Sequence, residues 1–222
     1  MAAEPLDLVL LGPVGAGKGT QARRIATRYA IPHVASGDLL RGHRAQDTEL
    51  GRTASQYMDR GALVPDDLVI SMVIERMRQP DAQGGILLDG FPRTVAQARA
   101  LDKELDSEGG RVLRLALYLE VPFETLVERA AGRWTCRNCQ ATYNYRVNPP
   151  SKPGVCDVCG GELYQREDDR ADVVAERIKV YLRDTVPVVE YYRERGILRE
   201  VDGTRDIEAV ASDIERQLEA AV

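Results

Sequence analysis

The segment at positions 12–20 has the residue types and the spacing of a phosphate-binding loop. It reads Gly-Pro-Val-Gly-Ala-Gly-Lys-Gly-Thr and follows a largely apolar run at Leu6–Leu11. Glycines at this spacing let consecutive backbone N–H groups converge on a polyanion, and a helix that begins at Lys18 adds the positive end of its dipole. Gly19 departs from the general pattern, which has Ser or Thr there, and the hydroxyl comes one residue later at Thr20. The segment predicts a site for the phosphates of a nucleotide.

Four cysteines stand in two Cys-x-x-Cys units, Cys136 with Cys139 and Cys156 with Cys159, with 16 residues between the units. This is the spacing of a zinc site with four thiolate ligands, in which two hairpins complete a tetrahedron and leave no position for water. The predicted metal is therefore structural. Iron could take the same ligands, and two disulfides are the alternative to a metal.

Polar residues follow the apolar run at positions 86–89. Asp89 ends that run, where parallel sheets bind ligands, and has the place of the carboxylate that holds magnesium in P-loop proteins; a turn or capping aspartate is the alternative. Arg93 follows on the same edge and could clamp a phosphate with two hydrogen bonds. Gln97 is ambiguous, because Thr94-x-x-Gln97 is also a capping box for the helix that follows.

Further arginines lie close to two interruptions of the strand and helix pattern. A single arginine is more often a solvated residue or an ion-pair partner, so position alone does not assign them to a site. They are Arg41, Arg129, Arg133, Arg166 and Arg177.

Alternating strands and helices must position these groups. Helical patterns separate five expected strands at 6–11, 33–35, 86–89, 112–119 and 197–201. Such alternation is typical of a parallel sheet that helices cover on both faces. The predicted fold is therefore an α/β fold of the P-loop type with five parallel strands flanked by helices.

Two stretches interrupt this pattern. Helical patterns at 38–60 and 66–78 are too long for one crossover, which predicts an inserted helical lobe. The stretch 133–165 loses helical periodicity around the cysteines, which predicts a second inserted lobe. A long amphipathic pattern at 168–195 contains Pro187, where we expect a kink or a break.

Composition limits the possible partners. The 222 residues include 30 basic and 35 acidic side chains, and the net charge of −5 argues against non-specific nucleic-acid binding. The sequence predicts neither a signal peptide nor a membrane span. We therefore expect a cytoplasmic protein that binds neither nucleic acid nor membranes. Nothing in the sequence demands a partner chain, so we expect a monomer.

Together, these motifs resemble the adenylate kinase family along essentially the whole chain. The resemblance rests on positions 12–21, 36–41, 89–93 with Gln97, and 202–204. The stretch from Arg133 through Asn-Pro-Pro to Arg-Glu-Asp-Asp at 166–169 is similar to the zinc-type lid of that family. The resemblance implies three parts, which are a core domain at 1–34, 65–131 and 170–222, an AMP-binding lobe at 35–64 and a zinc-binding lid at 132–169.

The resemblance also implies a role for individual residues. The ATP site would comprise Gly15, Ala16, Gly17, Lys18, Gly19, Thr20, Arg129, Arg133 and Arg205. The AMP site would comprise Ser36, Arg41, Val64, Gly90, Arg93, Gln97, Arg166 and Arg177, with Gln97 at the adenine edge. The catalytic group around the transferred phosphoryl would be Lys18, Arg93, Arg129, Arg166 and Arg177, and Asp89 would hold magnesium through water.

The implied activity is reversible transfer of the γ-phosphoryl group of MgATP to AMP, which gives two ADP. Another nucleoside monophosphate kinase, with GTP as donor or a pyrimidine nucleotide as acceptor, is the nearest alternative. A P-loop switch with a zinc-ribbon interaction module, which binds nucleotide without group transfer, is the alternative from another class. Asn144 and Arg205 stand where the family often has histidine and lysine, and these departures bear on the adenine pocket for ATP.

Overall fold

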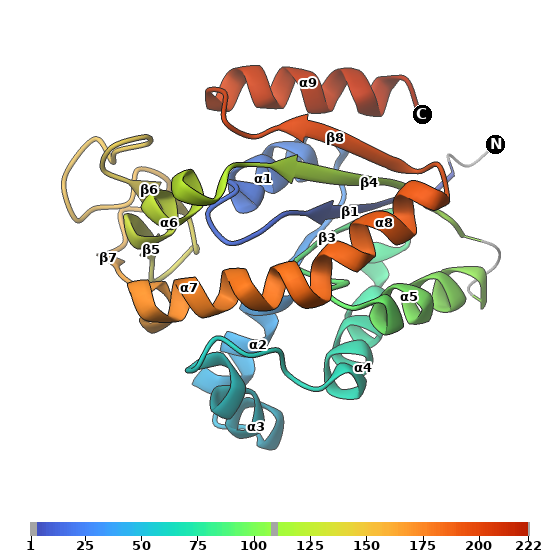
Figure 1. Cartoon of the computed structure of the whole chain (residues 1–222), viewed down its shortest axis with the longest axis horizontal. Coiled ribbons are helices and arrows are strands. Elements are labelled where there is room, and N and C mark those ends of the chain that lie inside the picture. The colour runs from blue at the N-terminus through green and yellow to red at the C-terminus, as the bar shows by residue number, and fades with distance from the viewer. Residues whose placement is uncertain (1–3, 108–110, 222) are drawn as a thin grey trace.

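A sheet of five parallel strands forms the centre of the computed structural model, which describes residues 4–107 and 111–221. In spatial order the strands are β2 (His33–Ala35), β3 (Gly85–Asp89), β1 (Leu6–Leu11), β4 (Leu113–Glu120) and β8 (Leu198–Asp202). Figure 1 labels the last four of them. The prediction of five parallel strands flanked by helices is confirmed. Residues 1–3, 108–110 and 222 of the expected core domain lie outside the described residues.

Both faces of the sheet are buried under helices, because β1 carries apolar side chains on each side. Val9 and Leu11 belong to one hydrophobic cluster, and Leu8 and Leu10 belong to the other. The first cluster includes residues of α4 (Asp66–Met77), α5 (Val95–Ser107) and α8 (Val186–Glu194). The second includes residues of α1 (Lys18–Tyr29), α6 (Phe123–Ala131), α7 (Ala171–Val180) and α9 (Ile207–Glu219). None of the helices in the described ranges is long and apolar enough to cross a membrane.

Two short helices fill the first interruption and extend away from the sheet (Figure 1). They are α2 (Ser36–Ala45) and α3 (Glu49–Met58), so the helical pattern at 38–60 contains a break that the sequence analysis did not place. Thr48 causes the break, because its Oγ1 accepts a hydrogen bond from the N–H of Gly51 at 3.0 Å and so caps α3. A Cβ atom on Gly51 would lie 2.2 Å from the carbonyl oxygen of His43, so only glycine allows the two helices to pack this closely.

A separate three-stranded antiparallel sheet fills the second interruption. Its strands are β6 (Thr142–Asn144), β5 (Arg133–Cys136) and β7 (Leu163–Tyr164), in that spatial order. This small sheet lies at one end of the molecule, beside α6 (Figure 1). Its buried cluster consists of Cys136, Ala141, Tyr143, Cys156 and Leu163, which is little apolar surface for a folded unit.

The pattern at 168–195 forms consecutive helical segments with an irregular turn close to Pro187. It starts later than predicted, at α7, and a π-helical turn at Tyr181–Thr185 separates α7 from α8. The break comes before Pro187 because proline has no N–H group for the carbonyl of the preceding turn, and the wider turn accommodates that missing bond. The turn brings Thr185 to the cavity described below, where its Oγ1 donates to the carbonyl of Arg93 at 3.0 Å.

Candidate active site

A cavity of about 310 Å³ opens at the carboxyl ends of the parallel strands. Its wall contains the phosphate-binding loop and parts of both inserted segments. Every nucleotide-site residue named from the sequence lines this cavity, although the roles of the individual residues stay predictions. Besides Lys18, the cationic side chains of the wall are Arg23, Arg41, Arg93, Arg129, Arg133, Arg166, Arg177 and Arg205. Such a wall suits a ligand with several negative charges.

Backbone geometry forms the phosphate-binding loop. Gly15 and Gly17 have φ angles of 86° and 93°, which favour glycine, and a Cβ atom on Gly15 would lie 2.5 Å from the carbonyl oxygen of Leu126. Lys18 begins α1, and its Nζ donates to the carbonyls of Gly12 at 2.8 Å and Pro13 at 3.1 Å. The ammonium group is therefore held over the loop, where phosphate oxygens could replace these carbonyls.

Burial lowers the pKa of Lys18 to about 8. The charge of Asp89 opposes this effect, whereas the nearby positive charges of Arg93 and Arg177 add to it. The charged form of Lys18 is therefore less favoured than that of a surface lysine. An anion bound in the cavity would favour the charged form again.

Asp89 ends β3 and faces the same loop. Burial would raise the pKa of its carboxyl, but a hydrogen bond from Nε2 of His33 at 3.2 Å and the charge of Lys18 hold that pKa below its usual range. A Cβ atom on Gly19 would lie 3.9 Å from Oδ2 of Asp89, so this glycine leaves space beside an ionised carboxylate. His33 carries no signal of its own in the sequence, because its contact with Asp89 depends on β2 lying next to β3.

Carboxylates hold the cavity arginines in place, and the sequence analysis gave these carboxylates no role. Nη1 of Arg177 donates to Oδ2 of Asp168 at 2.8 Å, and Nε of Arg133 donates to Oδ2 of the buried Asp169 at 2.9 Å. Burial lowers the pKa of Arg177, and neighbouring arginines lower it further. Two consecutive acidic residues within the motif at 166–169 were the available signal.

Two ion pairs connect α2 with the segment that follows the small sheet. Nη1 of Arg41 lies 3.8 Å from Oδ2 of Asp168, and Nη2 of Arg166 lies 3.6 Å from Oδ1 of Asp38. All four residues line the cavity. They bring the two inserted segments together over the sheet edge.

Gln140 links the small sheet to the same arginine cluster. Its Oε1 accepts from Nη2 of Arg166 at 3.1 Å, and its carbonyl accepts from Arg23 of α1. Gln140 has a φ of 58°, which is a left-handed conformation. The matching position after the second Cys-x-x-Cys unit is Gly160, which has a left-handed conformation as well. No motif in the sequence singles out this glutamine.

The end of the cavity near the loop also holds Arg129 and Arg205. Nη1 of Arg129 donates to the carbonyl of Gly203 at 2.7 Å, and Nη2 of Arg205 donates to Oδ2 of Asp213 at 2.5 Å. Nδ2 of Asn144 donates to the carbonyl of Arg129 at 3.1 Å. Both residues that depart from the family pattern, Asn144 and Arg205, therefore lie at this end of the cavity.

Another part of the cavity wall combines an amide with apolar side chains. Gln97 is buried but lines the cavity, and Leu40, Met58, Val64 and Val69 line it as well. One of the two hydrogen bonds of the predicted capping box forms, because the N–H of Gln97 donates to Oγ1 of Thr94 at 3.2 Å. The side chain of Gln97 bonds to other partners. An amide among apolar side chains has the chemistry to bind a flat heterocycle with a polar edge.

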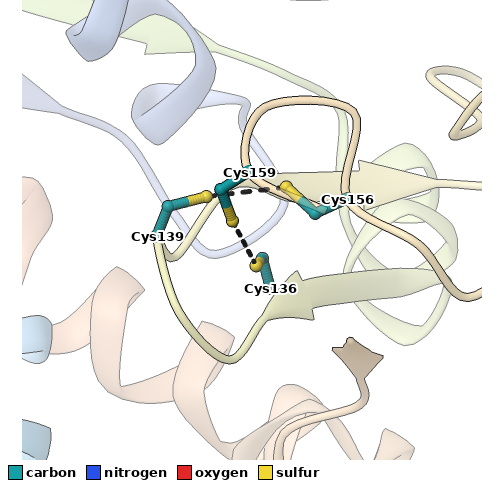
Figure 2. Close-up of side chains that lie close together, drawn as sticks. All are labelled: Cys136, Cys139, Cys156 and Cys159. Carbon is teal, nitrogen blue, oxygen red and sulfur yellow. Dashed lines mark hydrogen bonds between the residues drawn. The ribbon is translucent and has the colours of Figure 1, made fainter. Parts of the chain in front are cut away.

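The four cysteines come together outside the cavity. Figure 2 shows the thiols of the two Cys-x-x-Cys units pointing toward one another. All four are free thiols, with Sγ atoms 3.5 Å apart between Cys136 and Cys159 and between Cys139 and Cys156. The four Sγ atoms lie within 4.8 Å of one another.

This cluster fits a tetrahedral zinc ion. Sulfur atoms about 2.3 Å from a tetrahedral zinc lie about 3.8 Å apart, which agrees with the observed spacing. Burial works against ionisation of Cys156, yet hydrogen bonds from Tyr143 and backbone N–H groups lower the pKa of that thiol to about 6. Burial and the neighbouring thiols raise the pKa of Cys139 to about 12, so four thiolates need a cation among them.

The chain is similar to adenylate kinases over nearly its whole length. The family model described as adenylate kinase matches residues 10–197. The adenylate kinase of Moorella thermoacetica is 54% identical over 213 residues, which cover 96% of this chain and 98% of that protein. The adenylate kinase of Archaeoglobus fulgidus is 51% identical over 214 residues, with 96% and 98% covered, and that of Carboxydothermus hydrogenoformans is 50% identical over 214 residues, with 96% and 100% covered.

Proposed function

The chain belongs to the adenylate kinase family, and we propose that it transfers the γ-phosphoryl group of MgATP reversibly to AMP, with two ADP as products. One observation carries the assignment of residues to this reaction. One cavity wall contains two different groups, the loop with Lys18 and the amide of Gln97 among apolar side chains, and it also contains the arginines. A donor nucleotide at the first group and an acceptor at the second would place their phosphates against each other among the cations.

The donor end would bind the ATP phosphates through Gly15–Thr20, with Arg129, Arg133 and Arg205 around them. The acceptor end would bind AMP through Ser36, Arg41, Val64, Gly90, Arg93 and Gln97, with Arg166 and Arg177 toward the donor. Both sets of residues line one cavity, which supports a site for two nucleotides.

In the reaction, an α-phosphate oxygen of AMP would form a bond to the γ-phosphorus as the bond to the β,γ-bridging oxygen breaks. The electron pair of the broken bond stays on the β-phosphate of ADP. The attacking oxygen is already anionic, so no general base is needed. Lys18, Arg93, Arg129, Arg166 and Arg177 would align the phosphates and stabilise the charge that develops between them.

The metal sites have separate tasks. Asp89 is ionised beside Gly19, which carries no side chain, so Asp89 would hold magnesium through water, and the metal would neutralise part of the phosphate charge. The four thiolates of Cys136, Cys139, Cys156 and Cys159 would hold zinc in a closed shell that stabilises the small sheet. Only the first site would contribute to chemistry.

We assign the segments 35–64 and 132–169 as an AMP-binding lobe and a lid that close over the core. Closure would exclude water, which could otherwise accept the phosphoryl group. The ion pairs of Arg41 with Asp168 and of Arg166 with Asp38 support this assignment, because they join the two segments. A monomer in the cytoplasm, with ATP, AMP and ADP as its small-molecule partners, is the form that we expect.

Coupled assays of ATP with AMP, CMP, UMP and GMP test this function. We expect AMP to be the preferred acceptor, because the free edge of Gln97 suits adenine. Transfer to UMP with none to AMP would favour a pyrimidine nucleotide kinase instead. Nucleotide binding without transfer to any of the four acceptors would favour a switch.

A further inference from the structure

We propose that Asp66 is a positioning residue that fixes the orientation of the Gln97 amide and so makes the acceptor site select adenine over a 6-oxopurine. The inference rests on the proposed function, in which Gln97 meets the base of the acceptor. Asp66 is the first residue of α4 and does not belong to the cavity wall. Asp66 nevertheless contacts Gln97, because Nε2 of Gln97 donates to Oδ1 of Asp66 at 2.7 Å.

The hydrogen-bond partners of the Gln97 amide allow only one of its two orientations. The backbone N–H of Arg93 can only donate, and it contacts Oε1 of Gln97 at 2.8 Å. The carboxylate of Asp66 can only accept, so it must face the NH₂ group. A rotation of the amide by 180° would place oxygen against carboxylate and NH₂ against N–H.

The carboxylate itself is held. Oγ1 of Thr94 donates to Oδ2 of Asp66 at 2.7 Å and accepts from the N–H of Gln97. Asp66 therefore cannot turn away from Gln97 without breaking a second hydrogen bond. The start of α5 and the start of α4 are tied together at this point.

These contacts use one N–H and one oxygen lone pair of the amide. One N–H and one lone pair remain for a ligand, at fixed places. Adenine offers an acceptor at N1 beside a donor at its 6-amino group, which such an amide can pair. Hypoxanthine has the same ring system but carries a donor at N1 and an acceptor at O6, so it would need the rotated amide.

Asp66→Asn is the direct test, because asparagine has the same shape and can donate as well as accept. In this variant residue 66 no longer disfavours the rotated amide of Gln97, whereas the N–H of Arg93 still does. We expect the ratio of kcat/KM for AMP to kcat/KM for IMP to fall about tenfold. KM for AMP should rise while kcat stays close to that of the wild type, since Lys18 and the arginines are untouched.

Both acceptors are measured on the same preparation, so any loss of folded protein cancels in the ratio. Asp67→Asn is the matched control: Asp67 is the next residue of the same helical turn and is exposed, so the helix loses the same charge without a change near Gln97. An unchanged ratio in Asp66→Asn, or an equal fall in Asp67→Asn, would overturn the inference. A wild-type protein that transfers no phosphoryl group to AMP would instead overturn the proposed function.

Discussion

Arg93 is the residue whose loss should best separate catalysis from folding. Its Nε donates to the carbonyl of Gly90 at 2.7 Å, but Oγ of Ser36 donates to the same carbonyl at 2.6 Å. Arg93→Ala therefore leaves no unpaired carbonyl and removes a cation from the cavity. We expect kcat to fall about 10²- to 10³-fold while the melting temperature changes by less than about 3 °C.

Arg99→Ala is the control for this prediction, because Arg99 is an exposed arginine on the adjoining helix α5. It should change neither turnover nor melting temperature. A loss of stability in Arg93→Ala as large as its loss of activity would mark Arg93 as a structural residue.

Lys18 should give the reaction a pH limit on the alkaline side. Its pKa is lowered to about 8, so the side chain is cationic below that pH and increasingly neutral above it. Because only the cation attracts phosphate, kcat/KM for MgATP should fall about tenfold per pH unit once the pH is well above 8. The limit in kcat should lie at higher pH, since bound phosphates favour the charged lysine.

Lys18→Arg keeps the positive charge at this position over the same range of pH. Its kcat/KM should be lower overall but should not decline near pH 8. If the wild-type and Lys18→Arg profiles decline at the same pH, the titrating group is a different one.

Site residues that the sequence could predict are those with a motif of their own. One example is Lys18, which ends a glycine-rich loop, and two others are Asp89 and Arg93, which lie at and just after the end of an expected strand. Their position at the sheet edge was therefore predictable. Asp66 and His33 belong to no such motif. Their contacts with Gln97 and Asp89 arise from the packing of neighbouring elements, which one sequence does not specify.

At the scale of elements, the small sheet should depend on its metal. Its buried cluster has five residues, of which Cys136 and Cys156 are proposed metal ligands, so we expect metal binding to supply much of its folding free energy. Elemental analysis should find about one zinc per chain. Chelation should lower the melting temperature and reduce turnover.

Ser151→Ala, an exposed change in the same segment, leaves all four thiols in place and should keep the zinc. Cys139→Ser should lose it. Zinc loss without any change in melting temperature would contradict a stabilising role, and iron in the purified protein would contradict the assignment of the metal but not of its ligands.

Strands were easier to predict than helix ends because burial on both faces leaves a continuous apolar run. The run at Leu6–Leu11 became a strand with those bounds. The break at Thr48 and the π-helical turn before Pro187 depend on one cap and on one missing N–H group. The hydrophobic periodicity of an amphipathic helix does not reveal such local interruptions.

At the scale of the whole molecule, the cavity joins parts of the chain that are far apart in sequence. Its wall takes residues from the core sheet, from α2 and from the small sheet. The pairs of Arg41 with Asp168 and of Arg166 with Asp38 join these parts. They also leave the arginines partly neutralised, so phosphates that enter must compete with carboxylates.

This arrangement predicts that one ligand spanning both ends binds far more tightly than either nucleotide. Two adenosines joined by a chain of phosphates would occupy the loop and the Gln97 end at once, and the second contact would cost no further loss of translational freedom. Isothermal titration calorimetry should show an affinity at least about 10²-fold above that for ATP. Arg93→Ala should reduce this advantage while it leaves ATP binding largely unchanged, since Arg93 belongs to the acceptor end. A switch with a single nucleotide site would bind the joined ligand no better than ATP, because its second adenosine would remain in solvent.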